Sequence, residues 1–263
     1  MDMKNLYKPA IKCRIYMWPF ETLYIGPIHA RGGVIYASPV LCVSLGEAFK
    51  YREGNGPWID SYITCTPAGI FHEVRTNPSN IIAKYWVEGE SKHNFCLTQF
   101  SSMFEHSNYP NQKSIISTFN KIYENSCTSN EVKTAMDGLF NQQDGTRSKI
   151  DQRVLHLSRL LRNDPDYNFS IAHLASAVDL SPSRLLHLIK QDTGVAYRRF
   201  RMWHRVRYAL SIYGMQNSIT HSSIEAGFND SAHFTRCFSS FYGATPSSVL
   251  KSLEIYEVNS INN

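Results

Sequence analysis

The segment Phe169–Gly194 constrains the fold of this 263-residue chain more than any other, because it encodes two short helices joined by a tight turn. Ser170 is expected to cap the first helix, whose apolar residues recur at the three-and-four spacing of a buried face. Asp179 tolerates the left-handed conformation and is expected in the turn. Ser181 and Pro182 then begin a second helix, which a glycine ends. The segment is therefore predicted to be a helix-turn-helix unit.

The second helix of this unit has an apolar face and a polar face. The residues expected to point inward are Leu185, Leu188 and Ile189. The residues expected to point outward are Ser183, Leu186, His187 and Lys190. An amphipathic hairpin whose polar face simply meets water has the same pattern, so the interpretation of this face depends on the rest of the chain.

Length and composition limit the class of protein. A hydrophobic content of 43% over 263 residues suits one large or two ordinary domains with buried cores. No apolar run approaches the roughly 18 residues of a membrane helix, and the N-terminus does not resemble a signal peptide, so we expect a cytoplasmic protein without a membrane partner. The six cysteines are scattered without histidines at zinc spacing, which argues against a disulfide framework or a structural metal.

The positive charge of the chain is concentrated in one segment. Residues 1–146 hold equal numbers of basic and acidic residues, whereas residues 147–207 hold 12 basic and 5 acidic ones. Residues 208–263 are slightly acidic, with 2 basic and 4 acidic residues. The basic segment contains the predicted helix-turn-helix unit, which favours a polyanionic partner.

The first half of the chain reads as short β-segments separated by glycine and proline turns, which predicts an antiparallel sandwich or barrel. The expected strands are Leu23–Ile25, Gly33–Tyr36, Val40–Leu45, Ala48–Tyr51, Ser61–Thr64 and Ile81–Val87. Within this half, Pro67, Gly69 and His72 follow the spacing Pro-x-Gly-x-x-His. This motif, with the upstream stretch Gly26–Gly33, resembles the cupin-type sensor barrel.

Metal-dependent cupins take several histidines and a carboxylate from two motifs, and three protein ligands are the usual minimum for a catalytic metal. Only His29, His72 and Glu73 are evident here, and the paired His-x-His is missing, so we expect a barrel without a metal or another cofactor. The histidines and nearby aromatic residues either line a small-molecule pocket or belong to turns and core. The pocket candidates are His29, Tyr36, Phe49, His72 and Trp86.

From about residue 113 to residue 141 the apolar spacing becomes helical and predicts a helical hairpin. Its two apolar stripes pack either on the barrel of the same chain or on a partner chain in a homodimer. The polar stretch 141–146 is interpreted as an interdomain linker. We therefore expect a sensor or dimerisation domain over residues 1–144 and a second domain over residues 145–263.

The second domain is predicted to contain two helix-turn-helix units, at about 170–192 and 218–242, joined by a helix at about 196–213. That helix would be about 27 Å long at 1.5 Å per residue. Two units held this far apart could enter successive major grooves, which are roughly 34 Å apart along one face of DNA. The second unit follows the pattern less closely than the first.

Several residues of this domain occur at the positions of a known family. They are Leu174, Ala175, Ser181, Pro182, Leu185 and Gly194 in the first unit, Arg205, Val206 and Ala209 in the long helix, and Ala226–Phe238, Gly243 and Pro246 in the second unit. In these positions the chain resembles the DNA-binding domain of the AraC/XylS family of bacterial transcription regulators. The resemblance implies an α+β two-domain protein, with an N-terminal cupin-like antiparallel β-barrel with trailing helices and a C-terminal all-α double helix-turn-helix domain.

By resemblance, the recognition helices are Pro182–Asp192 and Ser231–Tyr242. The implied base-reading residues are Ser183, Leu186, His187, Ser231, His233 and Arg236. Histidine and arginine donate to guanine, serine contacts bases or phosphates, and leucine packs on a thymine methyl group. The cations expected to hold phosphates are Lys190, Arg198 and Arg199. Because Ser222 and Ser223 replace an apolar residue and an alanine of the family pattern, we expect the first unit to carry most of the affinity.

The resemblance implies a sequence-specific transcription regulator, most often an activator in this family, and not an enzyme. Its expected partners are double-stranded DNA, RNA polymerase, a small-molecule effector and a second copy in a homodimer. One alternative is a cupin-type enzyme or ligand-binding protein with a helical appendage, of which the enzyme would need metal ligands that we cannot identify. Another is an interaction protein whose second unit no longer reads DNA.

Overall fold

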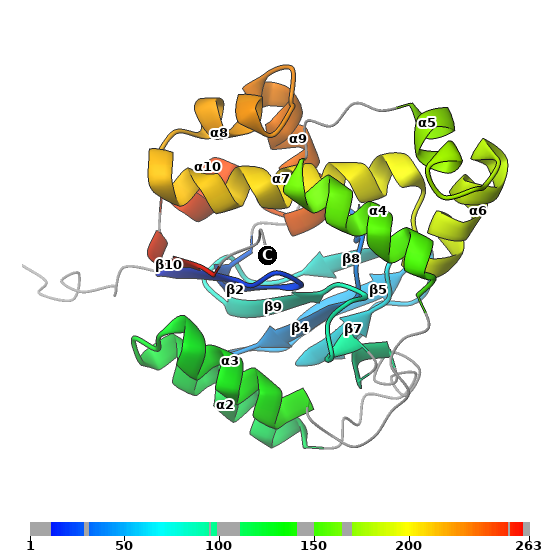
Figure 1. The fold of residues 1–263 in the computed structure, drawn as a ribbon. Helices are drawn as coiled ribbons and strands as arrows, with labels where there is room; N and C mark the ends of the chain where they lie inside the picture. Colours follow the sequence, from blue (N-terminus) through cyan, green and yellow to red (C-terminus); the bar gives the residue numbers. More distant parts are fainter. Residues whose placement is uncertain are drawn as a thin grey trace, which may run out of the picture.

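The computed structural model describes residues 12–28, 32–94, 96–98, 111–140, 150–164, 170–251 and 253–259. It places a β-rich N-terminal half beneath a helical C-terminal half (Figure 1). The predicted linker 141–146 and the pocket candidate His29 lie outside the described residues. No helix within the described ranges is long and apolar enough to cross a membrane.

The N-terminal half consists of two β-sheets. The six-stranded sheet has the order β10-β1-β2-β9-β4-β7. Its strands are β1 Cys13–Met17, β2 Glu21–Pro27, β4 Val40–Ser44, β7 Ile63–Thr66, β9 Ile81–Val87 and, from the end of the chain, β10 Leu253–Val258. The four-stranded sheet has the order β3-β8-β5-β6, from β3 Val34–Ile35, β5 Phe49–Glu53, β6 Ile59–Ser61 and β8 Phe71–Arg75. The described strands form no pairing between the two sheets, so the predicted cupin-like β-domain is an open sandwich and not a closed barrel.

The six-stranded sheet is covered on both faces, which explains why every residue of β1, β2 and β4 is buried. On one face, α2 Gln112–Glu124 and α3 Ser129–Phe140 pack Phe119 and Met136 against Leu23, Leu41 and Tyr85. Figure 1 shows this helical pair below the sheet. Of the two arrangements open for the hairpin at 113–141, packing on the same chain is therefore confirmed.

The C-terminal half is helical and centres on α7. Its helices are α4 Gln152–Asn163, α5 Ile171–Ser176, α6 Pro182–Thr193, α7 Tyr197–Gln216, α8 Ile219–Glu225, α9 Ser231–Tyr242 and α10 Pro246–Leu250. Helix α7 runs between α5–α6 at one end and α8 at the other (Figure 1). It buries Trp203, Val206 and Leu210. The predicted helix at 196–213 is confirmed, and it continues for three further residues.

The end of the chain returns to the N-terminal sheet. The strand β10 Leu253–Val258 pairs in parallel with β1, and Arg14 forms an ion pair with Glu254 at 3.2 Å. The Tyr256 hydroxyl also donates a hydrogen bond to the Leu210 carbonyl of α7. Assigning all of residues 145–263 to the DNA-binding domain was therefore wrong for this last strand. The strands β1 and β8 were also not predicted.

Candidate nucleic-acid interface

The first helix-turn-helix unit, α5 and α6, has the local structure that its sequence predicts. The Ser170 and Ser181 hydroxyls each accept a hydrogen bond at 3.2 Å from the backbone N–H three residues on. Asp179 has a φ of 53° in the turn, and Gly194 has a φ of 75° at the end of α6. These two left-handed positions reverse the chain between the helices and end the second one.

Helix α6 separates its apolar and polar residues as predicted. Leu185, Leu188 and Ile189 are buried against the other helices. The predicted DNA-contacting residues Ser183, Leu186, His187 and Lys190 are all exposed. Leu186 is 40% exposed, which is uncommon for a large apolar side chain and leaves it free to meet a partner. The structure thus brings these four predicted residues together on one open face.

The second unit, α8 and α9, is built in the same way. The Asp230 carboxylate caps α9 by accepting a hydrogen bond from the His233 N–H at 2.6 Å, and Gly243 ends the helix at a φ of 70°. The buried face of α9 is aromatic and consists of Phe234, Phe238, Phe241 and Tyr242. Of the predicted base-reading residues, Arg236 is exposed, whereas Ser231 and His233 are half-buried. The His233 ring packs edge-on against Phe228 at 5.3 Å.

Helix α8 exposes its large apolar residue and buries small polar ones. Ile224 is 59% exposed. Ser222 and Ser223 take the inward positions instead, and both are buried. The Ser223 hydroxyl donates to the Thr220 carbonyl at 2.9 Å, whereas the Ser222 hydroxyl has no hydrogen-bond partner among the described residues. A helix held by two small polar side chains buries little apolar surface.

Much of the positive charge of α7 points inward. Arg198 is exposed, as expected for a residue that holds a phosphate. Arg199 is not free in the same way, because its guanidinium donates to the carbonyls of Ile35 and Ser240 and lies 4.6 Å from the Phe241 ring. The expected phosphate contact of Arg199 therefore does not fit this arrangement. Arg205 donates to the Gly227 carbonyl at 2.6 Å and is also buried.

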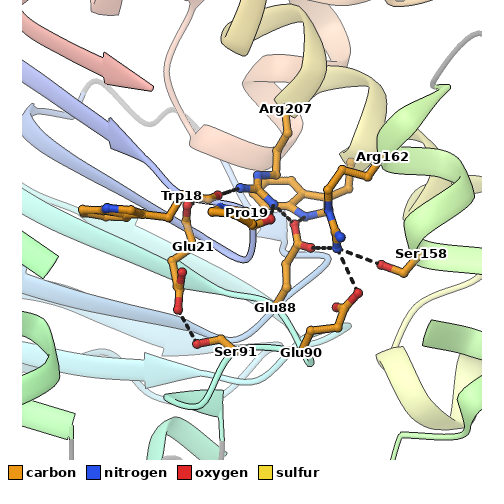
Figure 2. A network of polar contacts seen from close by, with 10 residues as sticks. Trp18, Pro19, Glu21, Glu88, Glu90, Ser91, Ser158, Arg162 and Arg207 are labelled. Carbon is orange, nitrogen blue, oxygen red and sulfur yellow. Dashed lines mark hydrogen bonds and ion pairs between the residues drawn. The ribbon is translucent and has the colours of Figure 1, made fainter. Parts of the chain in front are cut away.

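Glu88 is the centre of a buried polar network between the two halves (Figure 2). This residue directly follows β9, and its carboxylate accepts hydrogen bonds from Trp203 Nε1 at 2.9 Å and from the Arg207 guanidinium. Arg162, near the end of α4, donates to Glu88 at 3.3 Å and to Glu90 at 2.9 Å. Two acidic residues of the N-terminal half thus pair with two arginines of the C-terminal half.

Arg207 extends the same network to the backbone of the β1–β2 turn. Its guanidinium donates to the carbonyls of Trp18, Pro19 and Glu21, which leaves the side chain only 2% exposed. Burial alone raises the pKa of Glu88, but the charge of Arg207, aided by Arg162, lowers it to about 2. The carboxylate is therefore charged at neutral pH and holds α4 and α7 against the sheet.

The predicted pocket residues lie inside the β-sandwich. Tyr36, Phe49, His72 and Trp86 are all at most 2% exposed, and the rings of Tyr36 and His72 are 4.5 Å apart. Burial lowers the pKa of His72 to about 4, so this histidine is neutral at physiological pH. Tyr36, Phe49 and Trp86 belong to the hydrophobic core, and none of the four lines the cavity at the junction of the two halves. In the described parts of the chain no group of three or more His, Cys, Asp and Glu side chains could hold a metal ion.

A cavity of about 340 Å³ lies instead at the junction of the two halves. Its walls include Ala68 and Glu90 from the N-terminal half and Ser158, Asp192 and Trp203 from the C-terminal half. Asp192 and Gly194 belong to the end of the first recognition helix and its cap, and Gly194 meets the backbone of Ala68 closely enough that a Cβ would come within 2.8 Å of its carbonyl oxygen. The cavity therefore adjoins both the Glu88 network and the first helix-turn-helix unit.

Sequence reasoning did not identify the residues of this junction. Arg207 offered a signal, because it follows Trp203 by four residues and precedes Leu210 by three, which places it on the buried face of α7. Arg162 lies directly after the buried Leu161 in α4. A charged residue on an apolar stripe requires a buried partner, but the sequence does not say that the partner is Glu88.

Comparison with known proteins supports the assignment of the helical half. Residues 174–252 match the model of a family described as a helix-turn-helix domain. The arabinose operon regulatory protein of Escherichia coli (strain K12) is 39% identical over 100 residues, which are 37% of this chain and 34% of that protein. Its counterpart from Salmonella typhimurium is 37% identical over 37% of this chain and 36% of that protein. The chain thus matches about a third of the length of these relatives.

The fold of the whole chain is similar to solved structures of ToxT from Vibrio cholerae. An apo form from strain SCE256 has a TM-score of 0.60 at 13% identity and covers 91% of this chain and 100% of that one. ToxT from strain O395 has a TM-score of 0.54 at 15% identity, covering 92% and 98%. At this identity the likeness shows the two-domain fold. The sequence matches show in addition that residues 174–252 form a helix-turn-helix domain and that this part of the chain is similar to the arabinose operon regulatory proteins.

Proposed function

We propose that this chain is a sequence-specific DNA-binding regulator of transcription. The observation that carries the proposal is the open outer face of α6, where Ser183, Leu186, His187 and Lys190 are exposed in a capped recognition helix. His187 donates to the acceptor edge of guanine, Leu186 packs on a thymine methyl group, and Ser183 contacts a base or a phosphate. Lys190 holds a phosphate and contributes affinity without sequence preference.

The second recognition helix is proposed to add a smaller contribution. Arg236 is exposed and can reach a guanine edge, but Ser231 and His233 are half-buried. We assign the phosphate contact of this region to Arg198, which is exposed, and not to Arg199, whose guanidinium is bound to two carbonyls. The first unit therefore carries most of the affinity.

A salt titration of fluorescence anisotropy with a random duplex tests the proposal. Because bound phosphates release counterions, the logarithm of the affinity should fall steeply with the logarithm of the salt concentration. Lys190→Ala and Arg198→Ala should each reduce the slope by about one. A flat or absent response would exclude DNA binding.

A gel shift with a duplex selected by the intact protein tests the order of the two units. The double variant His187→Ala and Lys190→Ala should weaken binding more than Arg236→Ala does. The reverse order would show that the second unit dominates.

We further propose that a small-molecule effector controls the DNA-binding half by occupying the junction cavity. Two facts support this proposal: elements of both halves line the cavity, and a structurally similar ToxT has been solved with (E)-4-(8-methylnaphthalen-1-yl)but-3-enoic acid. Leu155→Trp, which places a larger side chain in the cavity at a lining position outside the Glu88 network, should abolish a thermal shift produced by cell-extract metabolites while leaving basal DNA binding intact.

The proposed function has further parts. We propose that the protein works in the cytoplasm as a homodimer and contacts RNA polymerase. We also propose that it activates transcription and does not catalyse a reaction. The family resemblance supports each of them. The outer surface of α2, which includes Lys113, Ile116 and Glu124, leaves a shallow groove that a second copy could cover. Sedimentation velocity of the purified chain tests the dimer, and in vitro transcription from a selected promoter tests activation.

A further inference from the structure

The second recognition helix ends against two cations that come from outside it. Helix α9 has no basic residue in its last turn, and its final carbonyls form the partly negative end of the helix dipole. Lys84 Nζ donates to the Tyr242 carbonyl at 2.9 Å, and the Arg199 guanidinium donates to the Ser240 carbonyl at 3.0 Å. Lys84 belongs to β9, so the N-terminal sheet directly caps a helix of the DNA-binding half.

Lys84 is an unusual residue for the interior of a sandwich. Its side chain is 1% exposed, and its ammonium group lies 5.5 Å from the Tyr36 ring and 5.9 Å from the Trp86 ring. No carboxylate of the described residues forms an ion pair with it. Burial of a charge costs free energy unless the charge is paired. Among the described residues, the Tyr242 carbonyl and the faces of the two rings offset the cost of burying the Lys84 ammonium group.

The strand that carries Lys84 holds it in a fixed place. Lys84 pairs with Tyr24 of β2 on one side and with Cys42 of β4 on the other, which makes β9 an interior strand. The ammonium group therefore cannot follow α9 if the helix moves. Tilting α9 away from the sheet would leave Lys84 buried without its hydrogen-bond acceptor, and this cost resists the tilt.

We propose that Lys84 is a positioning residue through which the N-terminal half sets the orientation of the second recognition helix. The inference rests on the proposed DNA-binding function. Arg236 extends from the outer face of α9, so the angle of the helix decides where its guanidinium meets the duplex. Arg199 braces the same helix end, because it also donates to the Ile35 carbonyl of β3.

Hydrogen exchange tests the capping contact without DNA. Lys84→Met keeps the length and apolar stem of the side chain but removes its charge and donor. The amides of the last turn of α9, including Gly243, should exchange at least about tenfold faster, because a hydrogen bond from a charged donor is lost. The amides of α6 should not change. Lys50→Met is the matched control, since Lys50 is an exposed lysine of β5 whose one ion pair with a described residue is with the exposed Asp60.

A footprint on a selected duplex tests the consequence for DNA reading. The half-sites are assigned first, with His187→Ala removing protection from one half and Arg236→Ala from the other. Lys84→Met should then lose protection over the Arg236 half while keeping it over the His187 half, a pattern that general destabilisation would not produce. If Lys84→Met does not fold, the comparison is made with Lys84→Gln, which retains a donor without the charge.

The outcomes separate the inference from the function on which it rests. If selection yields no bound duplex, the proposed DNA-binding function fails, and hydrogen exchange still measures the capping contact. If a duplex is bound and Lys84→Met gives the same exchange and the same footprint as Lys50→Met, the positioning role is overturned while DNA binding stands. Equal loss of both half-sites would also overturn it, because Lys84 would then support only the stability of the fold.

Discussion

Replacing Glu88 with glutamine should destabilise the protein more than any other single charge removal at the junction. The carboxylate is 6% exposed and faces Arg162 and Arg207 (Figure 2). It also accepts a hydrogen bond from the Trp203 indole N–H. Glu88→Gln preserves the shape of the side chain but leaves two buried arginines with one carboxylate, that of Glu90, between them. Because the contacts cross from the N-terminal sheet to α4 and α7, the loss falls on the junction of the two halves.

Two routes give similar magnitudes for this loss. Removing one partner of a buried ion pair costs about 3–5 kcal/mol. The pKa of the Glu88 carboxyl, held at about 2 instead of 4.5, gives a second value: at about 1.4 kcal/mol per pKa unit, the charged form contributes about 3 kcal/mol at neutral pH. The folded-state pKa is the lower one, so this contribution is present above pH 4.5 and is lost as the pH falls from about 4.5 toward 2.

Urea unfolding followed by circular dichroism measures the effect. At pH 7, Glu88→Gln should lower the free energy of unfolding by about 3 kcal/mol. Asp60→Asn is the control, because its ion pair with Lys50 is exposed and should contribute less than about 1 kcal/mol. The difference between Glu88→Gln and the unmodified protein should shrink as the pH falls below 4. A loss of unfolding free energy no larger than that of the control would refute this reasoning. A difference between the two proteins that does not change with pH would also refute it.

Two other substitutions probe the junction and the end of the chain. Gly194→Ala should lower the free energy of unfolding by about 1–3 kcal/mol, because the position has a φ of 75° and a Cβ would meet the Ala68 carbonyl. Gly138→Ala is the control. Gly138 lies in open space on α3, so this substitution should be neutral or stabilising by up to about 1 kcal/mol. Ending the chain after Lys251 should lower the free energy of unfolding by about 2 kcal/mol or more and promote aggregation, because the edge of β1 loses its partner strand β10. Unchanged urea unfolding would contradict this prediction.

The parts of the fold that sequence predicted are those encoded by neighbouring residues. Ser170, Ser181 and Asp230 cap helices because their side-chain oxygens reach a backbone N–H three residues away. Gly194 and Gly243 end helices because glycine adopts a positive φ without strain. Such signals involve a few consecutive residues, so both helix-turn-helix units could be predicted from sequence, together with the outward face of the first recognition helix.

The parts that sequence did not predict depend on residues far apart in the chain. Strand β10 forms because Leu253–Val258 meets the edge of β1, and the sequence of this segment does not identify β1 as its partner. The clustered arginines of α7 indicated a DNA-binding surface, yet Arg207 and Arg199 complete the interdomain junction. A count of charge along the sequence cannot separate cations that face solvent from cations that face a buried carboxylate.

The same contacts restrict how the N-terminal half of the proposed regulator could control DNA binding. It touches α4 through Arg162, α7 through Arg207 and the end of α9 through Tyr242, while the outer faces of α6 and α9 remain open. The described residues cover neither recognition face, so this arrangement does not point to control by release of a steric block. In the proposed regulator, a signal at the junction is instead expected to change the orientation of the two units, and the buried charges of Glu88 and Lys84 are contacts it would have to rearrange.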